Sequence, residues 1–151
     1  MNDDLASEAR IQVRRALREM AMHPGIMDEP DPLEALAALQ QLRGALAHAE
    51  RDAARRARES GKSWAQIGDA TVPDPAGSLY PAAEAFGRVA SDIGNGPSFP
   101  WTCPSCGNLV TDYGPYSGPH DGERGHSIGC ERFAATVQAW DAQWREGGED
   151  G

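Results

Sequence analysis

The chain has 151 residues and a formal net charge of −9, from 23 acidic and 14 basic residues. This length holds one modest domain or two small ones. A protein that binds phosphate backbones without regard to sequence normally carries the opposite charge, so the acidity argues against that class. No apolar run reaches the about 20 residues that span a bilayer, so no membrane association is expected. The polar opening MNDDLASEAR and the odd number of cysteines favour a reducing, cytoplasmic location.

Helical periodicity dominates the N-terminal part of the chain. A first helix is expected over residues 4–22. Asp31 is a candidate N-cap for a second helix, with Pro32 at its first position, and the pattern continues to Ser60 before Gly61 ends it. The apolar stripe of this second helix consists of Leu33, Leu36, Leu39, Leu42 and Leu46. Such a stripe is usually intramolecular core, and the alternative is a homodimer through this helix.

Two shorter helices are expected next. Ser63 and Gln66 have the spacing of a capping box at the start of one of them, SWAQIGDA. The other is expected over Tyr80–Ile93, with Phe86 among the residues of its apolar face. The stretch GNGPSFP, residues 94–100, is expected to be a linker and the domain boundary, because glycine and proline interrupt regular structure.

The run from residue 50 to residue 70, ERDAARRARESGKSWAQIGDA, resembles the start of a helix-turn-helix of small actinobacterial regulators. The matching residues are Ser63, Trp64, Ile67, Gly68 and Ala70. The stretch AAEAF at residues 82–86 would then begin the third helix. The resemblance implies a tri-helical DNA-binding scaffold. The connection TVPDPAGSLYP is longer than the three or four residues usual for this motif.

Basic residues gather in the same region. Between Arg43 and Lys62 there are six cations and three anions. The candidate nucleic-acid contacts are Arg51, Arg55, Arg56, Arg58, Lys62 and Arg88. The alternative is a solvated helix face, in which the interspersed acidic residues pair with these cations at helical spacing.

All three cysteines belong to one pattern, C-x2-C-x19-H-x3-C, formed by Cys103, Cys106, His126 and Cys130. Three thiolates and one imidazole are a common ligand set for structural zinc. His126 and Cys130 are four residues apart, so at the start of a final helix over 127–146 they would face the same point. His120 is the competing fourth ligand.

The order of a cysteine turn followed by helix-borne ligands resembles a treble-clef or zinc-ribbon module over residues 99–146. The resemblance implies a β-hairpin, with Trp101-Thr102 on one strand and Leu109-Val110 on the other, before the C-terminal helix. Four soft ligands would close the coordination shell, and no catalytic residues are identified in the sequence. We therefore expect structural zinc and no enzymatic activity.

Together these patterns predict a mainly α protein with a small zinc-bound hairpin. The expected organisation is a helical, helix-turn-helix-like region at 1–93, a linker at 94–100, a zinc-binding module at 101–146 and an acidic tail at 147–151. The expected function is that of a zinc-binding, DNA-binding or transcription-related regulator. The alternative is a protein–protein interaction adaptor that reuses the same helices and zinc module.

Overall fold

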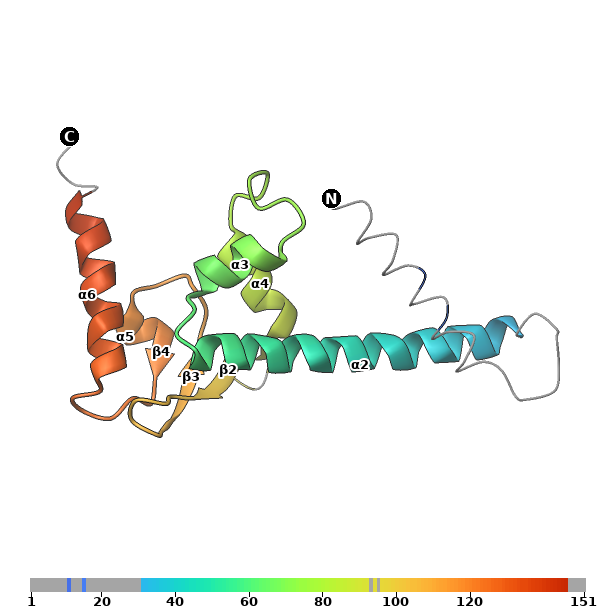
Figure 1. Ribbon diagram of the computed structural model, residues 1–151, viewed down its shortest axis with the longest axis horizontal. Coiled ribbons are helices and arrows are strands. Elements are labelled where there is room, and N and C mark those ends of the chain that lie inside the picture. The colour runs from blue at the N-terminus through green and yellow to red at the C-terminus, as the bar shows by residue number, and fades with distance from the viewer. Residues whose placement is uncertain (1–10, 12–14, 16–30, 93, 95, 147–151) are drawn as a thin grey trace. The chain divides into compact units, whose positions relative to one another are not determined.

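The computed structural model describes residues 11, 15, 31–92, 94 and 96–146 (Figure 1). These residues are mainly helical, with one small antiparallel sheet. The chain divides into two compact units, residues 1–49 and 50–151, which are described separately. Of the helix expected over 4–22, only Ile11 and Arg15 are described, and both are helical. The expected acidic tail at 147–151 lies outside the described residues.

Helix α2 (Pro32–Glu59) begins and ends where the sequence predicts. The Asp31 carboxylate accepts a hydrogen bond from the backbone N–H of Leu33 at 3.2 Å, as an N-cap should. At the other end, Gly61 has a φ of +93°, and its N–H donates to the carbonyl of Arg58. The Lys62 N–H donates to the Ala57 carbonyl. The two hydrogen bonds form a Schellman motif and satisfy the last carbonyls of the helix.

The leucine stripe of α2 is exposed, contrary to the expectation of an intramolecular core. Leu33 is 73% exposed, and Leu36, Leu39 and Leu46 also lie at the surface of their unit. Helical spacing shows that these leucines share one face but cannot show what covers that face. A homodimer through this helix therefore stays a prediction.

Helices α3 (Trp64–Thr71) and α4 (Pro81–Val89) pack against each other in the second unit. The capping box predicted at Ser63 is confirmed, since its hydroxyl accepts from the Gln66 N–H while the Gln66 side chain accepts from the Ser63 N–H. The two helices meet closely at Gly68, where a Cβ would lie 2.5 Å from the carbonyl carbon of Pro81. Residues 72–80 connect them, and α4 is shorter than expected.

Four short strands follow in a sheet of order β1-β2-β3-β4, with every neighbouring pair antiparallel. Their bounds are β1 (Ser91–Asp92), β2 (Pro97–Thr102), β3 (Leu109–Asp112) and β4 (Glu123–Arg124). The predicted hairpin is confirmed, and the structure adds its register, in which Trp101 pairs with Val110 and Thr102 with Leu109. The linker expected at 94–100 is partly strand, since β2 begins at Pro97 and pairs with β1.

One hydrophobic core joins residues from both sides of the expected linker. Trp64 contacts Phe86 and Phe99 edge to face, with ring centroids 5.1 and 5.3 Å apart. Trp101 and Val110 of the hairpin belong to the same buried cluster. Within unit 2, the helices and the sheet therefore share a core, and the glycine- and proline-rich stretch turns the chain inside it instead of separating two domains.

The last two helices are the short α5 (Pro119–Gly122) and α6 (Glu131–Glu146). The final helix was expected from Ser127 but begins four residues later, because Gly129 adopts a φ of +81° and the chain turns there. On α6, Phe133 packs partly buried against the core, and Trp140 is half-buried close to Gly118.

Candidate metal centre

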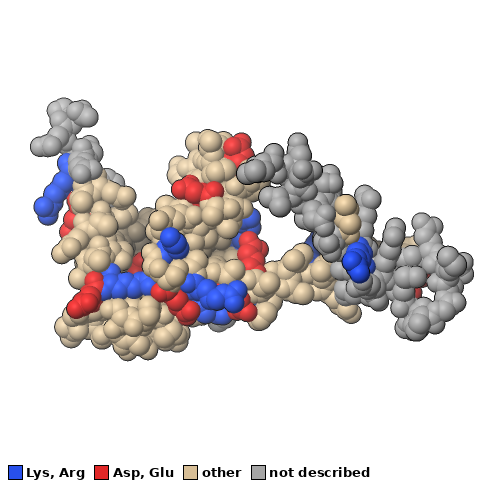
Figure 2. Space-filling model, in the orientation of Figure 1, with Lys and Arg blue, Asp and Glu red and all other residues tan. Residues whose placement is uncertain are grey.

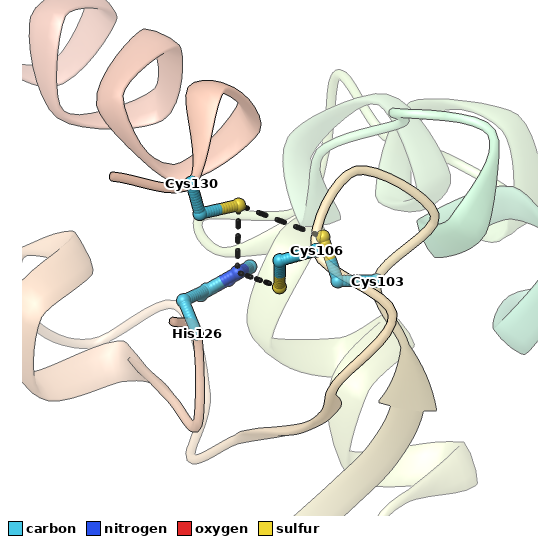
Figure 3. Close-up of side chains that lie close together, drawn as sticks. All are labelled: Cys103, Cys106, His126 and Cys130. Atoms are coloured by element: carbon cyan, nitrogen blue, oxygen red, sulfur yellow. Dashed lines mark hydrogen bonds between the residues drawn. The ribbon is translucent and has the colours of Figure 1, made fainter. Parts of the chain in front are cut away.

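The first half of the site is the turn between β2 and β3. The Gly107 N–H donates to the Cys103 carbonyl at 2.7 Å, and the Cys103 N–H donates to the Asn108 carbonyl at 2.9 Å. Gly107 closes this turn with a φ of +72°, a conformation that glycine adopts without strain. Cys103 and Cys106 are thereby presented on the same side of the hairpin (Figure 3).

The second half is the segment between β4 and α6. Gly125, with a φ of +113°, lies so close to the hairpin that a Cβ would come 2.4 Å from the Leu109 carbonyl oxygen. The Asn108 side chain donates to the Gly125 carbonyl at 3.1 Å, which ties this segment to the cysteine turn. His126 follows directly, and Cys130 immediately precedes α6, where its carbonyl accepts the first helical hydrogen bond.

The four predicted ligands meet at one point. Their ligand atoms all lie within 4.8 Å of one another. The Cys103 and Cys130 sulfurs are 3.8 Å apart, and His126 Nδ1 is 3.4 Å from the Cys130 sulfur and 3.9 Å from that of Cys106 (Figure 3). Around a tetrahedral metal ion, two thiolate sulfurs lie about 3.8 Å apart and a sulfur and an imidazole nitrogen about 3.5 Å apart. The side chains are therefore grouped as a metal site requires.

His126, and not His120, belongs to this group. His120 lies on α5, exposed, with its ring edge-to-face against Phe133 at 5.3 Å between centroids. The His126 ring stacks on Phe133 at 4.8 Å and contacts Trp101 edge to face at 5.8 Å. Two aromatic rings thus fix the imidazole plane of His126, while its Nδ1 points at the sulfurs.

The surroundings of the thiols favour their ionised form at two of three positions. Backbone N–H groups of Ser127 and Asn108 lower the pKa of Cys106 to about 5. The Phe133 N–H, in the first turn of α6, lowers the pKa of Cys130. Burial raises the pKa of Cys103, which is fully enclosed, so this thiol depends most on a bound cation to lose its proton.

Arg58, Asp112 and Glu123 form a buried ion-pair network that adjoins the four candidate ligands at His126. The Arg58 guanidinium of α2 donates to Asp112 at 2.8 Å and to Glu123 at 2.7 Å, and it lies 5.0 Å from the centroid of the Trp101 ring. Asp112 also accepts from the indole N–H groups of Trp64 at 2.8 Å and Trp101 at 2.9 Å. Among the described residues, no buried side-chain polar atom lacks a hydrogen-bond partner. The network is therefore saturated, as burial of charges requires.

A second arginine fastens the last turn of α2 to α6. Arg132 donates to the carbonyl oxygens of Arg58 and of Glu59, the latter at 3.0 Å. Its guanidinium lies 4.3 Å from the centroid of the Trp101 ring. A cation at the C-terminal end of a helix also interacts favourably with the helix dipole. Helix α6, which begins directly after Cys130, is thus joined to α2.

The sequence alone does not reveal the ion-pair network, although one residue of β3 points to it. Val110 and Asp112 alternate along β3, so a carboxylate occupies a position that faces the core. A charged residue at such a position needs a buried partner of opposite charge. The sequence offered several arginines in α2 but no means of choosing Arg58 among them.

Four of the six candidate nucleic-acid contacts are engaged within the protein, and three of them belong to α2. Arg58 is buried, so it is not available to a phosphate. Arg51 Nε donates to the Val89 carbonyl at 3.0 Å, and Arg55 pairs with Asp52 at 2.7 Å. The Arg55–Asp52 pair is of the kind expected of a solvated helix face, whereas Arg51 and Arg58 hold α2 against its neighbours.

The fourth engaged candidate, Arg88, lies at the surface, where it donates to the Thr71 hydroxyl at 3.4 Å and is 3.9 Å from Glu50. The other two candidates, Arg56 and Lys62, are exposed. On the face shown in Figure 2, Lys and Arg side chains alternate with Asp and Glu side chains. The described surface on this side therefore carries mixed charge and no continuous basic strip.

Helices α2, α3 and α4 also border an apolar hollow of about 480 Å³ in unit 2. We call it the alanine groove; its apolar lining includes Ala53, Ala54, Ala57, Ile67, Ala85 and Val89. Glu50 and Lys62 add one charge of each sign to the lining. A concave apolar surface with few polar groups is typical of binding sites for small molecules or peptides.

The candidate metal centre is the feature that the structure supports most directly. Among the described residues, no helix is long and apolar enough to cross a membrane. Comparisons of the chain with protein-family models, with curated proteins and with solved structures give no match.

Proposed function

We propose that Cys103, Cys106, His126 and Cys130 bind one Zn²⁺ ion in a closed structural site. The observation that carries the proposal is the convergence of three sulfurs and one imidazole nitrogen within 4.8 Å. Zn²⁺ prefers this donor set, and four protein ligands leave no open position for a substrate. The site then stabilises the hairpin and the start of α6, because the ion links segments that are far apart in the sequence.

Metal analysis of two matched histidine variants tests the proposal. We expect one zinc per chain in the wild-type protein and in His120→Ala, and loss of zinc in His126→Ala, because only His126 Nδ1 faces the sulfurs. Inductively coupled plasma mass spectrometry after dialysis gives the stoichiometry. Wild-type protein without zinc, or an equal loss in both variants, would contradict the proposal.

We further propose that the protein acts without enzymatic activity, as a zinc-stabilised protein-interaction module. The alanine groove supports this role, because it offers an apolar hollow of about 480 Å³, several of whose lining residues share the buried cluster with Cys103 and Cys130. The net charge of −9 also suits a protein partner better than a phosphate backbone. Substitution of Ala57 in the groove by Glu should abolish partner capture without loss of zinc.

A DNA-binding regulator is the second candidate. The observation in its favour is that Arg56 and Lys62 are exposed at the end of α2, next to the Ser63–Ala70 stretch that resembles a helix-turn-helix. A salt-titrated mobility shift on random and genomic DNA separates the candidates. Binding that weakens with salt and with Arg56→Ala supports the regulator. No shift at low salt removes it and leaves the interaction module.

A further inference from the structure

Glu123, the first residue of β4, lies between a candidate metal ligand and a buried arginine. Its Oε2 is 3.3 Å from His126 Nε2, and its Oε1 is 2.7 Å from Arg58 Nη2. The side chains of Glu123, His126 and Arg58 are 14%, 3% and 5% exposed. Because solvent is almost excluded, these two contacts determine the orientation of the Glu123 carboxylate.

The contact with Glu123 determines which nitrogen of His126 can bind a metal. His126 Nδ1 faces the sulfurs, so it must keep its lone pair free to act as a ligand. The ring proton then resides on Nε2, and Glu123 is the acceptor that lies against that nitrogen. A carboxylate behind a ligating histidine fixes its tautomer and raises its basicity.

Arg58 is held in turn by groups that leave it little freedom. Its Nε donates to Asp112 at 2.8 Å, and its Nη1 donates to the Lys62 carbonyl at 2.7 Å. Its Nη2 is then directed at Glu123. The planar guanidinium cannot satisfy these three acceptors in another orientation, so the position of Glu123 depends on the end of α2.

We propose that Glu123 and Arg58 are positioning residues of the metal centre. Glu123 fixes the tautomer and orientation of His126, and Arg58 fixes Glu123, although Arg58 forms no hydrogen bond or ion pair with any of the four ligands. The inference rests on the proposed zinc site and adds to it that a residue of α2 sets the affinity for the ion. Metal binding and the packing of α2 are therefore coupled through one carboxylate.

Glu123→Gln tests the first step with almost no change in shape. Both partners of the carboxylate are donors, and glutamine has only one acceptor oxygen, so its NH₂ group must face His126 or Arg58. We expect zinc affinity, measured by competition with a chromophoric chelator, to fall about 10- to 100-fold. The absorption spectrum of the Co²⁺-loaded protein should shift as well. Glu131→Gln, next to Cys130 but exposed, is the matched control and should bind like wild type.

Arg58→Lys tests the second step and keeps the buried positive charge. A lysine ammonium cannot replace the fork that serves Asp112, Glu123 and the Lys62 carbonyl, so zinc affinity should fall. In the Glu123→Gln background the same substitution should change the affinity by less than about twofold, because the link is already broken. Additive losses would overturn the role of Arg58.

A general loss of folding stability also lowers the apparent affinity for a metal that binds only the folded state, so a stability-matched control is needed. Gly68→Ala destabilises unit 2 at the α3–α4 contact without touching the network. If Gly68→Ala lowers the zinc affinity as much as Glu123→Gln does, for the same loss of stability, the positioning role is overturned. Unchanged affinity in Glu123→Gln also overturns it while the zinc site stands. A wild-type protein that binds no zinc overturns the proposed function itself.

Discussion

At the scale of single residues, Asp112 shows how one buried carboxylate organises the unit. It accepts hydrogen bonds from the indole N–H groups of Trp64 and Trp101 and pairs with Arg58. Trp64 begins α3, Trp101 belongs to β2 and Arg58 to α2. Removal of a single partner from such a buried network costs about 3–5 kcal/mol, because it leaves a buried charge uncompensated. Asp112 therefore links three elements at one point.

Gly68 and Gly87 form a matched pair for a test of helix packing. Gly68→Ala should lower the free energy of unfolding by about 1–3 kcal/mol, because the new Cβ would lie 2.5 Å from backbone atoms of Pro81. Gly87→Ala meets no atom within 4 Å and should stabilise the protein by about 0.5–1 kcal/mol, since alanine favours helix. Urea denaturation of both variants measures the difference. A stabilising Gly68→Ala would show that α3 and α4 are not in close contact.

At the scale of elements, the helix ends are the parts that local chemistry specifies best. Asp31 and Ser63 cap α2 and α3 through the side-chain hydrogen bonds that their spacing predicted, and Gly61 closes α2 with a positive φ. These interactions involve residues within a few positions of one another, so they need no tertiary context. By contrast, α6 begins later than predicted, because the Gly125 and Gly129 turns serve the metal site.

The capping box of α3 gives a prediction at this scale. Ser63→Ala should lower the free energy of unfolding by about 1 kcal/mol, because the Gln66 N–H loses its acceptor. Ser60→Ala removes only an exposed hydroxyl that donates to the Ala57 carbonyl, and a change below about 0.5 kcal/mol is expected. Chemical denaturation followed by Trp fluorescence compares the two. Equal losses would show that the box contributes nothing specific.

At the scale of the whole molecule, the candidate metal centre and helices α3 and α4 share one buried core. Cys103 and Cys130 are in the same buried cluster as Trp64 and Phe86. A treble-clef module confined to residues 99–146 would unfold alone on loss of its metal. Because the core is shared, a metal ion bound at this site would stabilise the helices as well.

Chelation should therefore expose amides well outside the metal site. After zinc removal, we expect hydrogen exchange to accelerate in α3 and α4 as well as in β2 and β3, because Trp64 and Phe99 belong to the same buried cluster as Cys103 and Cys130. The exposed first half of α2, in the other unit, serves as the internal control and should not change. Acceleration confined to residues 99–146 would contradict a shared core.

The sequence alone determined the features that short spacings control. It predicted the caps, the two strands of the hairpin and the grouping of His126 with the three cysteines, all of which agree with the structure. In each case the physical cause lies within a few residues or in the chemistry of rare thiols.

Only the tertiary structure decided which arginine is buried, whether the leucines of α2 are covered and whether residues 94–100 divide the chain. Arg58 and Arg55 look alike in sequence, but Arg58 pairs with the distant Asp112 and Glu123, whereas Arg55 pairs with its neighbour Asp52. Burial of an arginine depends on partners from distant segments, and the free energy of desolvation makes that choice decisive. No local pattern carries this information, because it arises when the helices and the sheet pack around one core.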